Sequence, residues 1–453
     1  MNLPNYFLAD LSDPAALTSS VVRDACQTLK QNRERYLIER TTSSLIRIIA
    51  SVAQNWLESN DPFRNEALER GPEATGFSRE ILATGLDTFF KQITKENLQA
   101  LVVQEFGDLQ RLDSLSANPD EQKLDRASFV LGPELIAHIT GGVIPNATLT
   151  SMILGLLIRS AQFVKCASGT SFIPRLFAHS IYEAEPKLGA CLEIAEWRGG
   201  SELLESALFA AADCVTATGG DETLETIRKQ VPQRIRFLGY GHRVSFAYVT
   251  EQVLSGMNPQ KIVARAATDV IAWNQLGCLS PHVIYVESGG TVSPEKFAEM
   301  LSAELHAMEQ AQPRGKLSLE ESANVAYRRS FYEVRAAHSL ETKMWRSADS
   351  SAWTVIFEND SRFQMSCLNR FIYVKAVANL KQAIEGSDNV RGIVSTVGIA
   401  APEDRAQEIA SELARWGVTR ICPLGQMQNP SLLWRHDGRP SLGDFVTWTD
   451  WEM

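Results

Sequence analysis

Trp273-Asn274-Gln275-Leu276-Gly277-Cys278-Leu279-Ser280-Pro281 is the stretch around which the rest of the sequence can be arranged. Before it, Asn258 and Pro259 suit the cap and the first position of a helix, and apolar residues follow at helical spacing as far as Trp273. We expect Gly277 to end this helix, because glycine adopts a left-handed cap without strain. Residues 282–287 then form a buried strand. The pattern predicts a helix-to-strand corner that holds Cys278 rigidly and aims its side chain into a cleft.

On these residues alone, two interpretations of Cys278 stay open. A cysteine is most often a small buried hydrophobe, whereas a cysteine aimed into a cleft can act as a nucleophile. The carboxyl end of a helix disfavours a thiolate, so any activation of this thiol has to come from elsewhere in the fold.

Composition excludes several classes of protein. The 453 residues suffice for about three domains and a large core. The net charge of −10 argues against general nucleic-acid binding. Seven widely spaced cysteines without a CxxC pair favour reduced thiols in the cytoplasm over a disulfide framework or a metal site. The most apolar run, residues 152–158, is too short to span a membrane, so we expect a soluble protein.

The order of predicted elements indicates an α/β protein with four regions. Residues 1–125 are mostly helical, either as a packing layer or as a cover for a long acyl chain. Residues 126–250 alternate short strands with helices, which predicts a parallel sheet wrapped by helices. Residues 251–425 form a second such unit, and residues 426–453 are a tail rich in tryptophan and charge. Strands are expected at 135–140, 163–166, 191–197, 214–217, 234–238, 282–287, 353–357, 371–375, 392–397 and 419–422.

Glycine-rich loops follow several strands of the first α/β unit. Sheets of this kind bind ligands beyond the carboxyl ends of their strands. The loops match neither GxGxxG nor a P-loop, so their glycines either admit a phosphate or simply make turns.

Four stretches are specific enough to compare with a known family. They are Phe237-Leu-Gly-Tyr-Gly-His-Arg-Val-Ser245-Phe, the Cys278 stretch, Leu368-Asn-Arg-Phe-Ile-Tyr-Val374, and Ile421-Cys-Pro-Leu-Gly-Gln-Met-Gln428 running on to His436-Asp-Gly-Arg439. Together they resemble the LuxC-type acyl-CoA reductases, which are fatty acid reductases of the aldehyde dehydrogenase superfamily. The resemblance covers roughly residues 129–453. It implies an aldehyde dehydrogenase-like fold, with a Rossmann-type cofactor domain at 126–250, a catalytic domain at 251–425 and the active site between them.

The resemblance implies NADPH-dependent reduction of an acyl thioester to an aldehyde, with Cys278 as the nucleophile that carries the acyl group. Its carbonyl would then accept a hydride, and the resulting anion needs N–H donors. The backbone N–H of Cys278 is the first donor. The superfamily's side-chain donor is an Asn where this sequence has Val143, so Asn146 is the candidate for the second. The superfamily's water-activating Glu is replaced by Phe237, which favours thioester reduction over aldehyde oxidation.

Five residues correspond to the superfamily's cofactor-binding positions. Lys165 and Ser168 match the strand end that holds the adenosine ribose and its phosphate, although a loop lysine can also simply be solvated. Thr218, Gly219 and Gly220 match the loop that meets the pyrophosphate. NADPH is the expected cofactor, with NADH as the alternative, and no metal is expected.

The expected partners are an acyl-CoA or an acyl-carrying protein, and a second copy of the chain that the tail could contact. Nucleic acid and membrane spans are not expected. Two alternative functions stay open. One is a non-redox cysteine acyltransferase or thioesterase, and the other is a non-catalytic aldehyde dehydrogenase-like binding subunit. His282 is either a base near the thiol or a hydrogen-bonded histidine of a buried strand.

Overall fold

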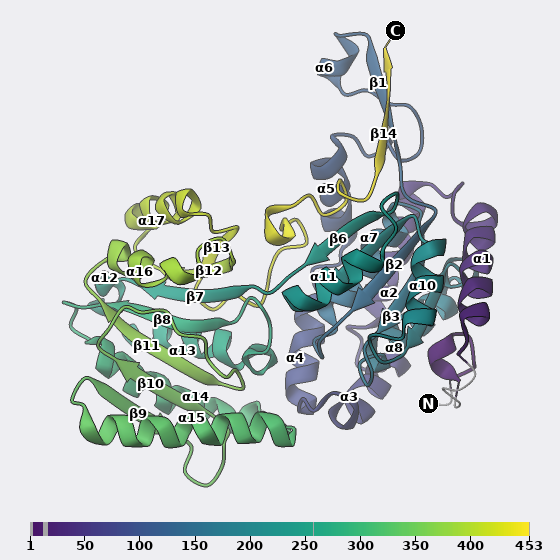
Figure 1. The fold of residues 1–453 in the computed structure, drawn as a ribbon. Coiled ribbons are helices and arrows are strands. Elements are labelled where there is room, and N and C mark those ends of the chain that lie inside the picture. The colour runs from purple at the N-terminus through teal and green to yellow at the C-terminus, as the bar shows by residue number, and fades with distance from the viewer. Residues whose placement is uncertain (1–2, 12–16, 257, 453) are drawn as a thin grey trace. The chain divides into compact units, whose positions relative to one another are not determined.

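The computed structural model describes residues 3–11, 17–256 and 258–452, which form two compact units (Figure 1). Unit 1 comprises the chain up to Thr75, Leu86–Gly241 and the chain from Ser431 on, and unit 2 comprises Gly76–Gly85 and His242–Pro430. The division falls inside helix α4 (Arg79–Phe90).

Unit 1 is built on a five-stranded parallel sheet with the strand order β4-β3-β2-β5-β6. The chain enters at β2, adds β3 and β4 on one side, and then returns to add β5 and β6 on the other. The reversal therefore lies between β2 and β5, where doubly wound sheets bind ligands beyond the strand ends. The strands are β2 (Leu135–Thr140), β3 (Ala161–Cys166), β4 (Leu192–Glu196), β5 (Cys214–Thr218) and β6 (Arg236–Tyr240).

Helices cover this sheet because successive strand side chains point to opposite faces. One face packs against α1, α10 and α11 in a continuous apolar core. The helical N-terminal region and the helices between strands are confirmed. The helices of unit 1 are α1 (Ser19–Tyr36), α2 (Thr42–Asn55), α3 (Pro62–Thr75), α5 (Lys95–Phe106), α6 (Pro119–Gln122), α7 (Asn146–Leu157), α8 (Phe172–Ala184), α9 (Pro186–Gly189), α10 (Glu202–Ala211) and α11 (Asp221–Gln230).

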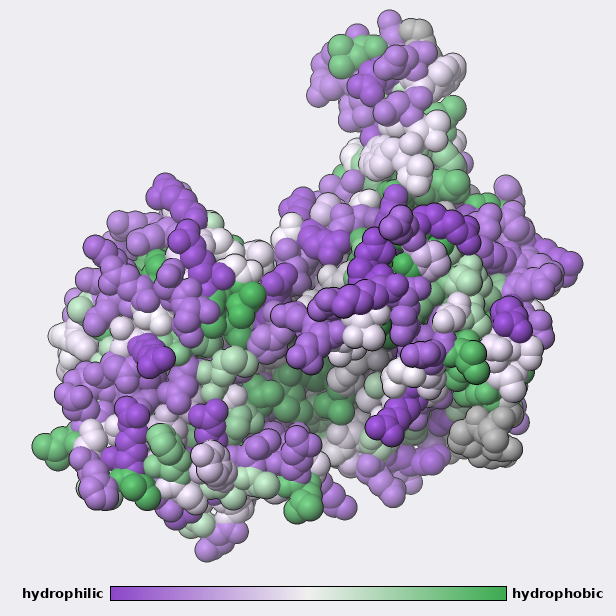
Figure 2. Space-filling view, in the orientation of Figure 1, coloured by the Kyte–Doolittle hydropathy of each residue, from purple (hydrophilic) through white to green (hydrophobic). Residues whose placement is uncertain are grey.

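A separate two-stranded antiparallel ribbon pairs β1 (Arg126–Leu131) with β14 (Thr447–Glu452). Trp448 packs edge-on against Phe106 and lies beneath the guanidinium of Arg111, so part of the tail is anchored within unit 1. Trp451 is half exposed, and Figure 2 shows hydrophobic residues among hydrophilic ones on the projecting ribbon. An isolated ribbon of two strands is only marginally stable in water.

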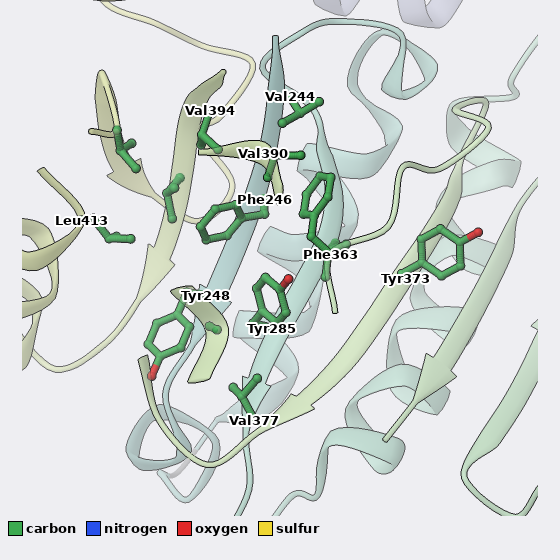
Figure 3. Close-up of a cluster of buried hydrophobic side chains, with 14 of the residues drawn as sticks. Val244, Phe246, Tyr248, Tyr285, Phe363, Tyr373, Val377, Val390, Val394 and Leu413 are labelled. Atoms are coloured by element: carbon green, nitrogen blue, oxygen red, sulfur yellow. The ribbon is translucent and has the colours of Figure 1, made fainter. Parts of the chain in front are cut away.

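Unit 2 contains a seven-stranded sheet with the order β13-β12-β7-β8-β11-β10-β9. All neighbours are parallel except β9, which runs antiparallel at one edge. Figure 3 shows part of the core of one face, with Phe246, Tyr285 and Tyr373 on three successive strands and with Phe363 and Leu413 among the other members of the cluster. The strands are β7 (Val244–Val249), β8 (Pro281–Glu287), β9 (Thr342–Arg346), β10 (Thr354–Glu358), β11 (Phe371–Val377), β12 (Val394–Ala400) and β13 (Arg420–Pro423).

Side chains cap the starts of the long helices of unit 2, and Asn258 does so as predicted. Asn258 accepts from Lys261 N at the start of α13, and Ser293 and Ser318 cap the next two long helices. The helices are α12 (Glu251–Leu254), α13 (Pro259–Ile271), α14 (Pro294–Ala311), α15 (Leu319–His338), α16 (Leu380–Gly386) and α17 (Glu403–Trp416).

Candidate active site and cofactor loops

Cys278 lies in a tight turn between α13 and β8. Ser280 N donates to Gly277 O over 2.9 Å, which closes a four-residue β-turn with Cys278 at its first corner. Cys278 is the exposed one of the seven cysteines, while Cys367 is half-buried and the others are buried. Burial raises the pKa of Cys367 and Cys422 to about 11. Exposure therefore singles out Cys278 as the thiol that a substrate can reach.

The expected role of Gly277 as a left-handed helix cap is wrong. Helix α13 ends at Ile271, and the left-handed residues are Trp273, Asn274 and Gln275, with φ of 50°, 53° and 66°. Three consecutive non-glycine residues with positive φ are strained, by about 1–2 kcal/mol each. Side-chain contacts hold them, since Asn274 Nδ2 donates to Arg314 O over 2.7 Å and Gln275 Nε2 donates to Pro281 O over 2.8 Å.

A second left-handed turn, Leu368–Arg370, lies against the first. Its residues have φ of 61°, 58° and 63°, and they open the third stretch on which the family resemblance rests. The buried guanidinium of Arg370 donates to Asn274 Oδ1 over 3.1 Å and to Gln312 O over 2.9 Å, and it pairs with Glu309. Two segments about 95 residues apart in the sequence are thus joined beneath the Cys278 turn.

The carbonyl of Cys278 is also fixed. Ser245 Oγ, from β7, donates to Cys278 O over 2.7 Å and accepts from Thr396 N over 3.1 Å. Ser245 is completely buried, so the donor side of this partly buried hydrogen bond is shielded from water. The peptide groups around the thiol therefore have a defined orientation before any substrate arrives.

His282 is a buried strand histidine. Its Nδ1 accepts from Ser366 N over 3.1 Å, which leaves the proton of the neutral ring on Nε2. Burial, together with the charge of His242, lowers the pKa of His282 to about 4. The ring is therefore neutral near pH 7 and contributes a hydrogen bond to the core.

In unit 1, loops with open space follow the strands at the predicted edge. A Cβ added to Gly142, Gly169, Gly199, Gly200 or Gly220 would meet no described atom within 4 Å. Gly141 is different, because its Cβ would lie 3.0 Å from Thr218 O, and this places the ends of β2 and β5 side by side. The edge of the sheet thus offers backbone N–H groups and room for a phosphate.

Lys165, the residue before the last of β3, is almost wholly buried, with its Nζ 5.8 Å from the centre of the Trp197 ring. Burial lowers the pKa of this lysine, against the attraction of Glu205 and Glu196. Glu196 also accepts from Gly169 N over 2.7 Å and so orders the loop that contains Ser168. On the other side of β2, Thr218 ends β5, and Gly219 and Gly220 connect it to α11.

Asn146 begins α7, and its Oδ1 is buried without a hydrogen-bond partner among the described residues. Val143 is exposed on the preceding loop. Asn146, Lys165, Ser168 and the Thr218 loop belong to unit 1, whereas Cys278 belongs to unit 2. The residues predicted to bind the cofactor thus lie at the carboxyl ends of the strands of unit 1, and the described contacts around the thiol all come from unit 2.

Two general features concern the described part of the chain. No group of three or more His, Cys, Asp or Glu side chains there could hold a metal ion. Nor does any helix described there combine the length and apolar character needed to cross a membrane.

Comparisons with known proteins identify the family of this chain and its fold. Residues 37–448 match the acyl-CoA reductase (LuxC) family. The chain is 22% identical over 395 residues to a long-chain acyl-protein thioester reductase of Aliivibrio fischeri, covering 86% of this chain and 78% of that one. It is 23% identical over 417 residues to the reductase of the same name from Photorhabdus luminescens, covering 90% and 82%.

Among solved structures, the NAD-dependent benzaldehyde dehydrogenase of Corynebacterium glutamicum aligns with a TM-score of 0.70. The two sequences are 14% identical, and the alignment covers 96% of this chain and 90% of that one. The fold is therefore aldehyde dehydrogenase-like, as predicted.

Proposed function

This chain belongs to the acyl-CoA reductase (LuxC) family, and we propose from that membership that it reduces a long-chain acyl thioester to the aldehyde with a nicotinamide cofactor. The observation that supports this most is the exposed thiol of Cys278, set at the corner of a turn whose backbone is anchored on both sides. A buried thiol with a pKa near 11 could not serve as this nucleophile.

In the proposed reaction, the Cys278 thiolate attacks the thioester carbonyl, and the thiol of the acyl donor leaves. The acyl-cysteine carbonyl would then be reduced by the hydride that a dihydronicotinamide supplies when it is bound. The resulting oxyanion collapses, the carbon–sulfur bond breaks, and the aldehyde leaves with the Cys278 thiolate restored. One acyl thioester, one NADPH and one proton thus give one aldehyde, one thiol and one NADP⁺.

The chain's own groups would orient and stabilise these species. The Cys278 backbone N–H is the first proposed donor to the oxyanion, and its peptide group is oriented by the hydrogen bond from Ser280 N to Gly277 O. Asn146 is the proposed second donor. Losing one donor of this kind typically costs about 2.7–4 kcal/mol of transition-state stabilisation. The proposed reaction has no hydrolytic step, which is consistent with Phe237 where the superfamily has a water-activating Glu.

We assign the cofactor to residues 126–250 and the thiol chemistry to residues 251–425. Lys165 and Ser168 would hold the adenosine ribose and its phosphate, and Thr218, Gly219 and Gly220 would meet the pyrophosphate. We propose NADPH rather than NADH, because only NADPH has a phosphate on the adenosine ribose. The relatives are named for acyl-protein thioesters, so an acyl-carrying protein and an acyl-CoA are both proposed donors. The protein would act in the cytoplasm. A second copy of the chain is a further proposed partner, because the β1–β14 ribbon exposes Trp451.

The test is turnover with a series of acyl-CoAs and NADPH, followed by nicotinamide absorbance and by intact mass. The wild type should oxidise NADPH and show an acyl adduct when NADPH is omitted. Cys278→Ala should lose at least about a thousandfold in rate and lack the adduct. Cys367→Ala is the matched control, because that thiol is half-buried and should be dispensable.

Other outcomes would point to the alternatives. Acyl release that proceeds equally well without NADPH would indicate an acyltransferase or a thioesterase. Absence of both adduct and turnover with every donor would indicate a binding subunit. Normal turnover by Cys278→Ala would rule out this cysteine as the nucleophile.

A further inference from the structure

The turn after β13, residues 424–429, is held from two sides by charged side chains. Asp269, on α13, is buried and accepts from Gly425 N over 2.6 Å and from Met427 N over 2.8 Å. Arg420 donates to Met427 O over 2.7 Å and to Gln426 O over 2.8 Å. Within this short turn, Asp269 thus binds backbone N–H groups, and Arg420 binds backbone carbonyls.

This anchoring is costly for a surface turn. Burial raises the pKa of Asp269 to about 7, even though two backbone N–H groups and Arg420 favour its carboxylate. Burying a carboxylate is unfavourable unless its hydrogen bonds are well made. Ordinary turns need no such support, because glycine and local hydrogen bonds suffice. The backbone immediately before Gln428 is therefore held by more hydrogen bonds to charged side chains than an ordinary turn has.

Gln428 contacts both ends of the turn that carries the thiol. Its Nε2 donates to Ser280 Oγ, and Ser280 is the last residue of that turn. The first residue is Gly277, where an added Cβ would lie 2.4 Å from Gln428 Nε2 and 3.0 Å from its Cδ. The amide thus occupies the space that any side chain at position 277 would need. This contact, rather than a left-handed φ, explains the glycine.

We infer that Gln428 is a positioning residue for Cys278, clamping the Gly277–Ser280 turn so that the thiol and the neighbouring backbone N–H keep one orientation. Asp269 and Arg420 act through Gln428 by fixing the turn that carries it. The consequence for catalysis rests on the proposed function, whereas the consequence for thiol reactivity does not. Both can be measured separately.

The first experiment measures the rate of iodoacetamide alkylation of Cys278 by intact mass across pH, in a Cys367→Ser background that removes the half-buried thiol. Gly277→Ala and Gln428→Ala should each change the rate at least about threefold. The double variant should match Gln428→Ala within a factor of two, because the added methyl no longer meets an amide. Independent effects would instead multiply, and that result would overturn the inference.

A second variant distinguishes positioning from mere packing. Gln428→Glu keeps the side-chain shape but places a carboxylate against the turn, and a nearby negative charge disfavours a thiolate. The pH midpoint of alkylation should therefore rise above that of Gln428→Ala, and kcat should fall more than KM changes. An unchanged midpoint in Gln428→Glu would contradict a contact with the thiol's surroundings.

Gly256→Ala is the matched control, since its added Cβ would meet its nearest neighbours at an ordinary 3.6 Å. It should alter neither alkylation nor unfolding. If the alkylation pattern holds while the wild type shows no reductase activity, the proposed function fails and the positioning role stands. If activity is present while the effects of Gly277→Ala and Gln428→Ala multiply, only the positioning role fails.

Discussion

Lys165 shows what a single residue contributes at the cofactor edge of unit 1. Its ammonium group lies at the end of a fully buried strand and over an indole ring, and burial lowers its pKa. A cation held there gains from any anion that enters the open loops beside it. A charge-assisted hydrogen bond contributes about 1.5–3 kcal/mol, which corresponds to roughly a 10- to 150-fold change in affinity.

Lys165→Met keeps most of the apolar stem and removes the charge. We expect NADPH to bind at least about tenfold more weakly, and NADH to lose less, because only NADPH carries the additional phosphate. Titration of the nicotinamide fluorescence on binding gives both constants. The control is Lys187→Met, because Lys187 is a lysine of α9 that likewise lies over an aromatic ring, that of Tyr36. Equal losses for both cofactors would argue against contact with the phosphate, and no loss would argue against any cofactor role.

Individual residues also show where prediction from sequence stops. Cys278 could be singled out because a motif surrounds it, and its exposure agrees with the interpretation as a nucleophile. Gly277 was recognisable as special, but the reason for it is a contact with Gln428, about 150 positions away. Ser245, Arg370 and Gln428 all lie within stretches that resemble the family, yet nothing in their local pattern indicates what they touch. Such contacts belong to tertiary structure.

At the scale of elements, two left-handed turns of three residues each carry the surroundings of the thiol. Of the six residues only Asn274 and Asn369 are of a type that tolerates positive φ, so the strain of the other four persists only because the neighbouring structure determines it. Arg370 is the main link, since it binds Asn274 of one turn from its place in the other. Burial lowers the pKa of Arg370 to about 10, and Glu309 opposes this shift.

Arg370→Met should therefore destabilise unit 2 by about 3–5 kcal/mol, because Glu309 and Asn274 Oδ1 both lose their buried partner. The measurement is the midpoint of urea-induced unfolding followed by circular dichroism. Arg362→Met, at an exposed arginine, should leave the midpoint within the error of the wild type. A change below about 1 kcal/mol in Arg370→Met would show that the two turns hold without this guanidinium.

The regular elements were largely predictable from the sequence, for physical reasons. β2 matches its predicted range, and the helices between strands follow their periodicity and caps, because burial of one face dictates the pattern. β7 and β9 are absent from the predicted strands, although both belong to the sheet of unit 2. β1 and β14 are also absent, because their pairing joins residues more than 300 positions apart and β14 has no buried face.

At the scale of the whole molecule, each unit contains a buried histidine and a largely buried carboxyl group whose shifted pKa values have opposite effects on how stability changes with pH. In unit 1, His138 donates to Gln162 Oε1, and burial lowers its pKa to about 4. Burial raises the pKa of Glu193 to about 8. Unit 2 contains the same combination, because burial lowers the pKa of His282 to about 4 and raises the pKa of Asp269 to about 7. A neutral histidine and a protonated carboxyl group are thus the favoured buried forms.

The direction in which stability changes with pH follows from the number of protons that the folded and unfolded states bind. Between about pH 4 and 6.5 an unfolded chain protonates the histidines while the folded state does not, so their contribution is lost as pH falls. Between about pH 4.5 and 8 the folded state holds a proton on Glu193 that the unfolded chain releases, so that contribution is lost as pH rises. Each unmatched proton changes the free energy of unfolding by about 1.4 kcal/mol per pH unit. The two effects oppose each other from about pH 4.5 to 6.5.

Glu193→Gln should therefore remove the opposing effect and leave the loss of stability that His138 causes as pH falls. The free energy of unfolding of this variant should fall, relative to the wild type, by about 1.4 kcal/mol for each pH unit between 6.5 and 4.5. His138→Gln should do the opposite and lose stability relative to the wild type as pH rises through the same window. Urea unfolding at half-unit pH steps gives both slopes against the wild type. Parallel curves for the wild type and Glu193→Gln would show that the Glu193 carboxyl group is already ionised in the folded protein, in which case its two backbone hydrogen bonds, from Leu8 N and Ile194 N, outweigh the effect of burial.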